Sequence, residues 1–245
     1  CMPQPIYAIG DIHGQLDELE RVLSLIDADG GPDAAIVFVG DYVDRGPDSR
    51  GVIDLLAKVQ DAGRPWTMLK GNHDRYFQRF LTNGALHDPA TRADLLWLNP
   101  RLGGDKTLLS YGIDIEAYAE TAELAAQARA EVPQRHVAFL QGLPSLHVTD
   151  ELIFVHAGIR PGVPLDKQIE DDLVWIRDPF LTDTRDHGKL VVHGHTALDQ
   201  PQHHGNRVNL DAGAGYFRPL HAAVFEGRDC WRLTDAGRLP LLPTL

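Results

Sequence analysis

Five short segments, in a fixed order along the chain, combine glycine with Asp, Asn or His. These side chains bind divalent metals at water-filled sites. A single Asp-x-His or Gly-Asn-His segment is more often an ordinary turn than a pair of ligands. Five such segments in one chain instead predict a two-metal hydrolytic centre, where the ions orient a hydroxide and clamp a phosphoryl group. The segments are residues 10–14, 40–46, 71–74, 155–158 and 192–196.

The first two segments supply carboxylates. Asp11 and His13 are two residues apart, so both can reach one ion, and the glycines that flank them let the backbone bend around it. Asp41 ends an apolar run, and its two carboxylate oxygens can bridge two ions. The first two segments therefore offer ligands for one ion and a carboxylate that could reach a second.

The later segments supply neutral ligands. Asn72 limits the negative charge that a phosphate would meet, and His156 could close a second metal site. His193 and His195 alternate with a glycine, so one could be the ligand and the other its neighbour. A two-metal site thus needs groups from both halves of the chain.

Three further residues are not needed as ligands and could act on the substrate. Arg45 could present its planar guanidinium to a phosphate. His73 could protonate a leaving oxygen, with Asp44 orienting its ring. The alternative is that Asp44 and Arg45 form a salt bridge within the turn. Arg177 follows an apolar run, a position that is usually a solvated strand end.

The elements that must hold these residues follow from periodicity. Apolar runs at 6–9, 36–39 and 66–69 read as buried strands, and helix-spaced apolar residues separate them. Ser49 is the expected N-cap of the second helix. Repeated strand and helix indicate a parallel sheet, and the first three segments each follow a strand, at the edge where such sheets bind ligands.

The remainder of the chain differs in pattern. Residues 81–143 are predicted to be mostly helical and to cap the cleft, while strands dominate from residue 145 onward. Together these patterns predict one domain, 2–245, built as a sandwich of two sheets with helices outside. The later strands are expected at 146–148, 152–155, 190–192, 208–210, 222–225 and 230–233.

Composition excludes several classes of function. The chain has 35 acidic against 23 basic residues and a net charge of −12, and no basic run offers a track for nucleic acid. No apolar run is long enough to span a membrane. We therefore expect no nucleic-acid or membrane partner. The scarcity of cysteine makes the cytoplasm the default location, and a monomer is favoured.

The segments Gly-Asp-Ile-His-Gly, Gly-Asp-Tyr-Val-Asp-Arg-Gly and Gly-Asn-His-Asp resemble the signature of the phosphoprotein phosphatase family, within the calcineurin-like metallophosphoesterases. The resemblance covers nearly the whole chain, and residues 103–112 and 172–181 are similar to its bacterial and phage lambda phosphatase-like branch. It implies an α/β fold of four layers, α/β/β/α, with two mixed β-sheets flanked by helices. It also implies two divalent ions, usually Mn²⁺ and sometimes Fe or Zn.

The resemblance assigns roles by motif position. Arg45, Arg177, Asn72 and His73 would contact the phosphate, with Asp44 supporting His73. The family usually has Glu at the position of Asp74, and the tyrosine that closes the active site in eukaryotic members has no clear counterpart. The implied ligands are Asp11, His13 and Asp41 for the first ion, and Asp41, Asn72, His156 and His195 for the second.

The resemblance implies a serine/threonine protein phosphatase, acting on a phosphorylated protein or peptide through a metal-bridging hydroxide. The family also contains symmetrical dinucleoside tetraphosphate (Ap4A) hydrolases, which typically carry Ala at the position of Asp44. The intact Asp44-Arg45 pair therefore favours the protein phosphatase, with the tetraphosphate hydrolase as the alternative. A phosphoprotein-binding module without catalysis is a third reading, which the complete ligand set disfavours.

Overall fold

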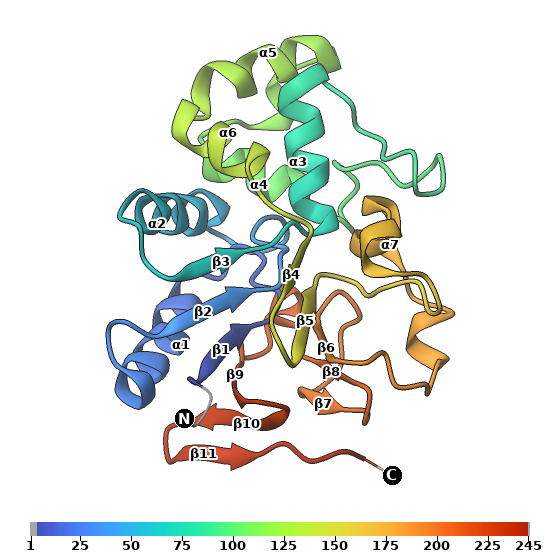
Figure 1. The fold of residues 1–245 in the computed structure, drawn as a ribbon. Coiled ribbons are helices and arrows are strands. Elements are labelled where there is room, and N and C mark those ends of the chain that lie inside the picture. The colour runs from blue at the N-terminus through green and yellow to red at the C-terminus, as the bar shows by residue number, and fades with distance from the viewer. Residues whose placement is uncertain (1–3, 245) are drawn as a thin grey trace.

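The computed structural model describes residues 4–244, whose strands form two mixed sheets (Figure 1). In the first sheet β1, β2 and β3 are parallel, and β9 joins the other edge of β1 in antiparallel pairing. Its strands, in spatial order, are β11 (Gly237–Pro240), β10 (Asp229–Thr234), β9 (Ala222–Glu226), β1 (Ile6–Ile9), β2 (Ala35–Phe38) and β3 (Trp66–Met68).

The second sheet comes from the later half of the chain. Its central strands β5, β6 and β8 are parallel, and β4 and β7 pair antiparallel at its two edges. The order is β4 (Leu146–Val148), β5 (Leu152–Val155), β6 (Leu190–His193), β8 (Arg207–Asn209) and β7 (Gln202–His203).

Helices lie on the outer side of each sheet and above their upper edges (Figure 1). Apolar residues at helix spacing bury one face of each long helix, as Leu19, Val22 and Ile26 do in the first. The helices are α1 (Leu16–Gly30), α2 (Ser49–Asp61), α3 (Asn72–Asn83), α4 (Gly104–Ser110), α5 (Thr121–Glu131), α6 (Gln134–Gln141) and α7 (Glu170–Trp175).

Three apolar cores separate four layers. Side chains alternate across a strand, so in β5 Phe154 faces the other sheet while Ile153 faces outward. The core between the sheets joins Ala8 and Val37 to Phe154 and its neighbours. One outer core packs α1, α2 and α3 on the first sheet, and the other packs α7 on the second. This confirms the predicted four-layered α/β/β/α fold.

The structure differs from the sequence-based expectation in local details, and β7 and β11 are strands that the sequence did not predict. Asp48, not Ser49, caps α2, because its carboxylate accepts the amide of Gly51, while Ser49 is the first helical residue. The cap segment 81–143 is helical mainly from residue 104 onward, and residues 84–103 form turns and loops. Pro89 and Pro100 disfavour a helix in that stretch. Residues 2, 3 and 245 of the predicted domain lie outside the described part of the chain.

Candidate active site and metal centre

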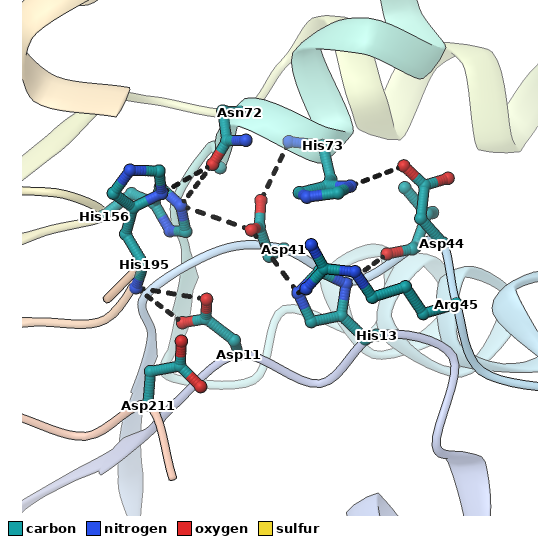
Figure 2. A network of polar contacts seen from close by, with 12 residues as sticks. Asp11, His13, Asp41, Asp44, Arg45, Asn72, His73, His156, His195 and Asp211 are labelled. Carbon is teal, nitrogen blue, oxygen red and sulfur yellow. Dashed lines mark hydrogen bonds and ion pairs between the residues drawn. The ribbon is translucent and has the colours of Figure 1, made fainter. Parts of the chain in front are cut away.

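All five predicted segments meet at one place, where the parallel strands of both sheets end (Figure 2). Asp11 and His13 follow β1, and Asp41 follows β2. Asn72 and His73 begin α3 just after β3. His156 directly follows β5, and His195 lies two residues beyond β6. The expectation that the carboxyl ends of the strands gather these residues therefore agrees with the fold.

The loops that carry these residues are strained. Six non-glycine residues among those described have positive φ angles, and five of them are predicted site residues. Such backbone costs energy and tends to occur where function constrains geometry. The site residues are His13, Asp41, Asp44, Arg45 and His195.

Two glycines are required because carboxylates occupy the adjacent space. A Cβ at Gly71 would overlap the Asp41 carboxylate, and one at Gly194 would overlap that of Asp11. The glycines of the third and fifth segments therefore let α3 and the β6 loop approach the carboxylates closely.

Asp41 is the centre of the cluster. His13 Nδ1 lies 2.8 Å from the Val43 carbonyl, and His156 Nδ1 lies 2.9 Å from the Val39 carbonyl. Because a carbonyl only accepts, both rings carry a proton on Nδ1. Their Nε2 atoms then face Asp41 Oδ2, at 3.6 and 3.4 Å respectively. Backbone carbonyls fix metal-binding histidines in this way, leaving Nε2 for an ion.

The second half of the cluster gathers donor atoms that suit a cation. Asn72 Oδ1 lies 2.8 Å from His156 Nε2 and 2.9 Å from His195 Nδ1. Burial disfavours a charged ring, yet the carboxylates of Asp41 and Asp11 outweigh it and raise the pKa of His156 to about 10. The buried Nε2 of His195 has no hydrogen-bond partner among the described residues. Positive charge is thus favoured here, and a divalent ion fits the donor atoms.

Two groups of side chains offer ligand atoms close enough to hold an ion. His13, Asp41 and His73 form one group, and Asp41, His156 and His195 form the other. Asp41 belongs to both, which fits the predicted bridging role. His73 is a member of the first group, whereas the sequence analysis expects it to protonate the leaving oxygen and not to bind an ion.

Asp11 lies at the edge of the cluster rather than in either group. Its two oxygens accept the amide of His195, at 3.2 and 3.1 Å. Asp211, which sequence reasoning missed, is buried beside it (Figure 2). Burial and the Asp211 carboxylate hold the pKa of Asp11 well above its usual range. A signal was present, because Asp211 follows the predicted strand 208–210 as Asp11 and Asp41 follow theirs.

His73 and Asp44 form the predicted pair. His73 Nδ1 lies 2.6 Å from Asp44 Oδ2. The carboxylate of Asp44 also accepts Trp97 Nε1 at 2.9 Å and Thr107 Oγ1 at 2.6 Å. The alternative of an Asp44–Arg45 turn salt bridge is absent from residues 4–244. Asp44 instead connects the cap segment to the ring of His73 and fixes its orientation.

His193 and His195 are distinguished by strand geometry. His193 lies on the outward face of β6, where its ring packs 5.1 Å from that of Phe180. Arg207 Nη1 donates to its Nε2 at 3.1 Å, so Nδ1 holds the proton and faces the Gly194 carbonyl at 3.0 Å. Burial lowers the pKa of His193 to about 3. Both of its nitrogens are occupied, whereas His195 Nε2 is free.

A cavity of about 250 Å³ opens over these residues. Arg45 and Arg177, to which the resemblance assigns phosphate contacts, line it. Sequence reasoning missed Arg101, Trp175 and Tyr216, which also line this cavity. The Tyr216 ring lies 4.9 Å from the Arg45 guanidinium. A larger cavity of about 560 Å³, beside β7 and β10, contains none of the predicted site residues.

The sequence, fold and site define the class of protein. Residues 4–224 match the calcineurin-like phosphoesterase family, and the chain belongs to that family. This confirms the class expected from the signature segments. The family implies divalent metal ions, and the two groups around Asp41 provide places to bind them.

Relatives of the chain share most of its length. A bis(5′-nucleosyl)-tetraphosphatase PrpE (asymmetrical) of Geobacillus thermodenitrificans is 27% identical over 237 aligned residues, which cover 87% of each chain. One of the same name from Oceanobacillus iheyensis is 26% identical over 257 aligned residues, covering 96% of this chain and 93% of the relative.

Solved structures share the fold. A candidate diadenosine tetraphosphatase superimposes with a TM-score of 0.66 at 23% identity, covering 99% of this chain and 96% of that one. A cold-active protein-tyrosine phosphatase of a psychrophilic Shewanella gives a TM-score of 0.67 at 17% identity, covering 98% and 81%. At these identities the two similarities describe the fold alone.

Among the helices of residues 4–244, none is both long and apolar enough to cross a membrane.

Proposed function

We propose that this protein is a metal-dependent hydrolase of dinucleoside tetraphosphates. The observation that carries the choice of substrate is the name shared by relatives that match 84–96% of the chain. Sequence analysis favours a protein phosphatase and keeps a symmetrical tetraphosphate hydrolase as the alternative. The relatives support the nucleotide substrate of that alternative, and their names specify asymmetrical cleavage.

The structure weakens the argument that favoured a protein phosphatase. That argument rested on Asp44, a residue that the symmetrical hydrolases typically lack. Asp44 here holds His73 through a 2.6 Å hydrogen bond and is itself held by Trp97 and Thr107. An oriented histidine is useful for cleaving any phosphate ester or anhydride. Asp44 therefore supports catalysis in general and does not select a phosphoprotein.

The chain offers a set of groups that could hold two ions, and we propose manganese. The ligands would be Asp11, His13, Asp41, Asn72, His156 and His195, with His73 a further candidate beside Asp41. When bound, such ions supply hydroxide at neutral pH and neutralise phosphate charge.

The remaining groups act on the substrate. Arg45 and Arg177 line the cavity and could hold the oxygens of the phosphate under attack, where charge develops. His73, fixed by Asp44, could pass a proton to the departing oxygen. The departing group of a tetraphosphate is itself a nucleotide phosphate, which leaves more readily than a serine alkoxide. Catalysis on that substrate thus depends more on the arginines than on the proton.

A comparison of substrates tests the proposal. We expect kcat/KM with Mn²⁺ to be larger for diadenosine tetraphosphate than for a phosphoserine peptide. Chromatography of the products should show ATP and AMP, the products of asymmetrical cleavage, and two ADP would indicate symmetrical cleavage. The Asp41→Asn variant, purified in the same way, controls for contaminating enzymes. A clear preference for the phosphopeptide would overturn the nucleotide proposal and favour the protein phosphatase.

A further inference from the structure

Three arginines line the cavity above the candidate metal centre, and none of them forms an ion pair with another described residue. Arg45, Arg101 and Arg177 line this cavity. Within residues 4–244, no carboxylate lies within ion-pair distance of any of the three. The arginines that do form such pairs are Arg21, Arg75, Arg92, Arg135, Arg160, Arg185, Arg218, Arg228 and Arg238.

The chain has eighteen arginines, and half of them form no ion pair within residues 4–244. The distinguishing feature of these three is therefore that they line the same cavity, in a chain whose net charge is −12. A cleft that keeps positive charge raises the local concentration of anionic ligands. The cavity therefore favours a highly anionic substrate, although the protein as a whole is acidic.

Arg45 and Arg177 account for one phosphate, which leaves Arg101 without a role. Arg101 belongs to the loop 84–103 of the cap segment, and its side chain is exposed. The loop is tied to the catalytic segment 40–46. Arg45 donates its amide to the Gly103 carbonyl at 3.2 Å and its Nε to the Arg101 carbonyl at 3.4 Å.

Hydrogen bonds within the loop 84–103 also hold the backbone of Arg101. Its amide donates to Asn99 Oδ1 at 3.0 Å, and the amides of Leu102 and Gly103 donate to the Asn99 carbonyl at 2.8 and 3.0 Å. Because the backbone is already fixed, binding a ligand would have to order only the side chain of Arg101. Arg101 is thus positioned beside Arg45 and free to bind a ligand.

The alternative explanation is that Arg101 is an ordinary solvated surface residue without a role in binding. Arg92, in the same loop, fits that reading because it is exposed and lies 3.4 Å from the equally exposed Asp94. Arg101 differs in two respects. It lines the cavity that contains Asp41, and it has no carboxylate partner among the described residues.

We infer that Arg101 binds a phosphate adjacent to the one that is cleaved and thereby selects polyphosphates over phosphomonoesters. The inference rests on the proposed function and names the specificity residue of that site. A guanidinium binds two phosphate oxygens in parallel, with geometry that a monoester cannot exploit at this position because it has no second phosphate.

Arg101→Ala tests the inference, with Arg92→Ala as the matched control from the same loop. Losing a hydrogen bond to a charged group costs roughly ten- to a hundredfold in kcat/KM. We expect that loss for diadenosine tetraphosphate and a change within about threefold for para-nitrophenyl phosphate. Arg92→Ala should change neither rate, and unchanged thermal unfolding of both variants excludes a folding defect.

A second measurement separates failure of this inference from failure of the proposed function. Inorganic tripolyphosphate and orthophosphate are compared as inhibitors of para-nitrophenyl phosphate hydrolysis, with free Mn²⁺ held constant. Arg101→Ala should weaken inhibition by tripolyphosphate about tenfold and leave that by orthophosphate unchanged. If the wild-type protein cleaves no diadenosine tetraphosphate, only the proposed function is refuted. A weakened inhibition by tripolyphosphate in Arg101→Ala would still support the role of Arg101 in binding a second phosphate. Equal losses on both substrates, or unaltered tripolyphosphate inhibition, overturn the inference.

Discussion

At the scale of single residues, Asp41 connects the two halves of the candidate metal centre. Its Oδ2 faces both His13 and His156, while its Oδ1 accepts the amide of His73 at 2.9 Å. The carboxylate therefore also sits at the N-terminus of α3, where the helix dipole favours negative charge. Asp11 does not connect the two groups of ligands in this way. Its oxygens accept the His195 amide, and the Asp211 carboxylate lies beside it.

This difference predicts unequal effects of the two carboxylate-to-amide changes. Asp41→Asn should lower para-nitrophenyl phosphate turnover by more than about a hundredfold, since loss of an outer ligand contact alone costs ten- to a hundredfold. Asp11→Asn should cost less. Metal content by elemental analysis should fall more for Asp41→Asn, and exposed Asp94→Asn serves as the control. An Asp41→Asn variant with two ions per chain and near-normal rate would contradict the bridging role.

At the scale of elements, Arg75 joins the parts of the fold that carry the cavity. It lies on α3, directly after the ligand segment, and is buried. It holds Asp88 of the loop 84–103 through bonds of 2.7 and 2.8 Å, and Asp171 of α7 at 2.7 Å. Trp175 Nε1 also lies 3.3 Å from Asp88. One side chain thus fixes the two segments that precede Arg101 and Arg177.

Arg75→Met should destabilise the protein by about 3–5 kcal/mol at pH 7, because it leaves Asp88 buried and charged without its partner. Urea unfolding gives the free energy. The matched control is Arg160→Met, which removes an exposed bidentate pair with Asp172 and should change stability little. If both variants unfold at the same urea concentration, Arg75 does not act as a clamp.

The effect should also depend on pH. Burial favours the neutral form of Asp88, but the hydrogen bonds from Arg75 outweigh it and hold the pKa of Asp88 below its usual value. A lowered pKa contributes stability above the unfolded value near 3.9, and this contribution is lost as the pH falls. In Arg75→Met, burial acts on Asp88 without the hydrogen bonds from Arg75 and raises its pKa, so protonation of Asp88 relieves the variant as the pH falls from 7. The difference in stability between wild type and Arg75→Met should therefore shrink from pH 7 downward, through the lowered pKa of wild-type Asp88. A difference that stays constant over this range would refute this account.

At the scale of the whole molecule, the fold gathers several buried carboxylates at one place. Asp11, Asp41, Asp44 and Asp211 are all buried near one another, in a chain with a net charge of −12. Buried carboxylates without cations are costly. Bound divalent ions would therefore stabilise the folded state as well as take part in catalysis.

Chelation should abolish turnover and lower the melting temperature together. An ion at a hundred times its Kd stabilises the folded state by about 2.7 kcal/mol, which corresponds to roughly 5–10 °C for a domain of this size. Scanning calorimetry before and after EDTA and dialysis measures the shift. Adding Mn²⁺ should restore both properties, whereas Na⁺ should restore neither. Full turnover by protein verified as metal-free would refute the two-metal mechanism.

Local sequence by itself determined most of the elements and the identity of the central cluster. The strands 6–9, 146–148 and 152–155 are observed with the predicted bounds, because apolar runs flanked by turn residues depend on near neighbours. The five segments are also local, since glycine and its adjacent ligands lie within a few residues of each other. Their common position follows from the rule that parallel strands gather their carboxyl ends at one edge.

Only the tertiary structure decided the pairings between residues distant in sequence. The strands β9 to β11 return to the first sheet, although they follow the second in the chain. Spacing left His193 and His195 open, and family resemblance alone favoured His195. The fold shows that His193 faces outward toward Arg207. Arg101 and Asp211 likewise reach the site through long-range contacts. Such proximity depends on how the layers pack, which periodicity within one segment does not encode.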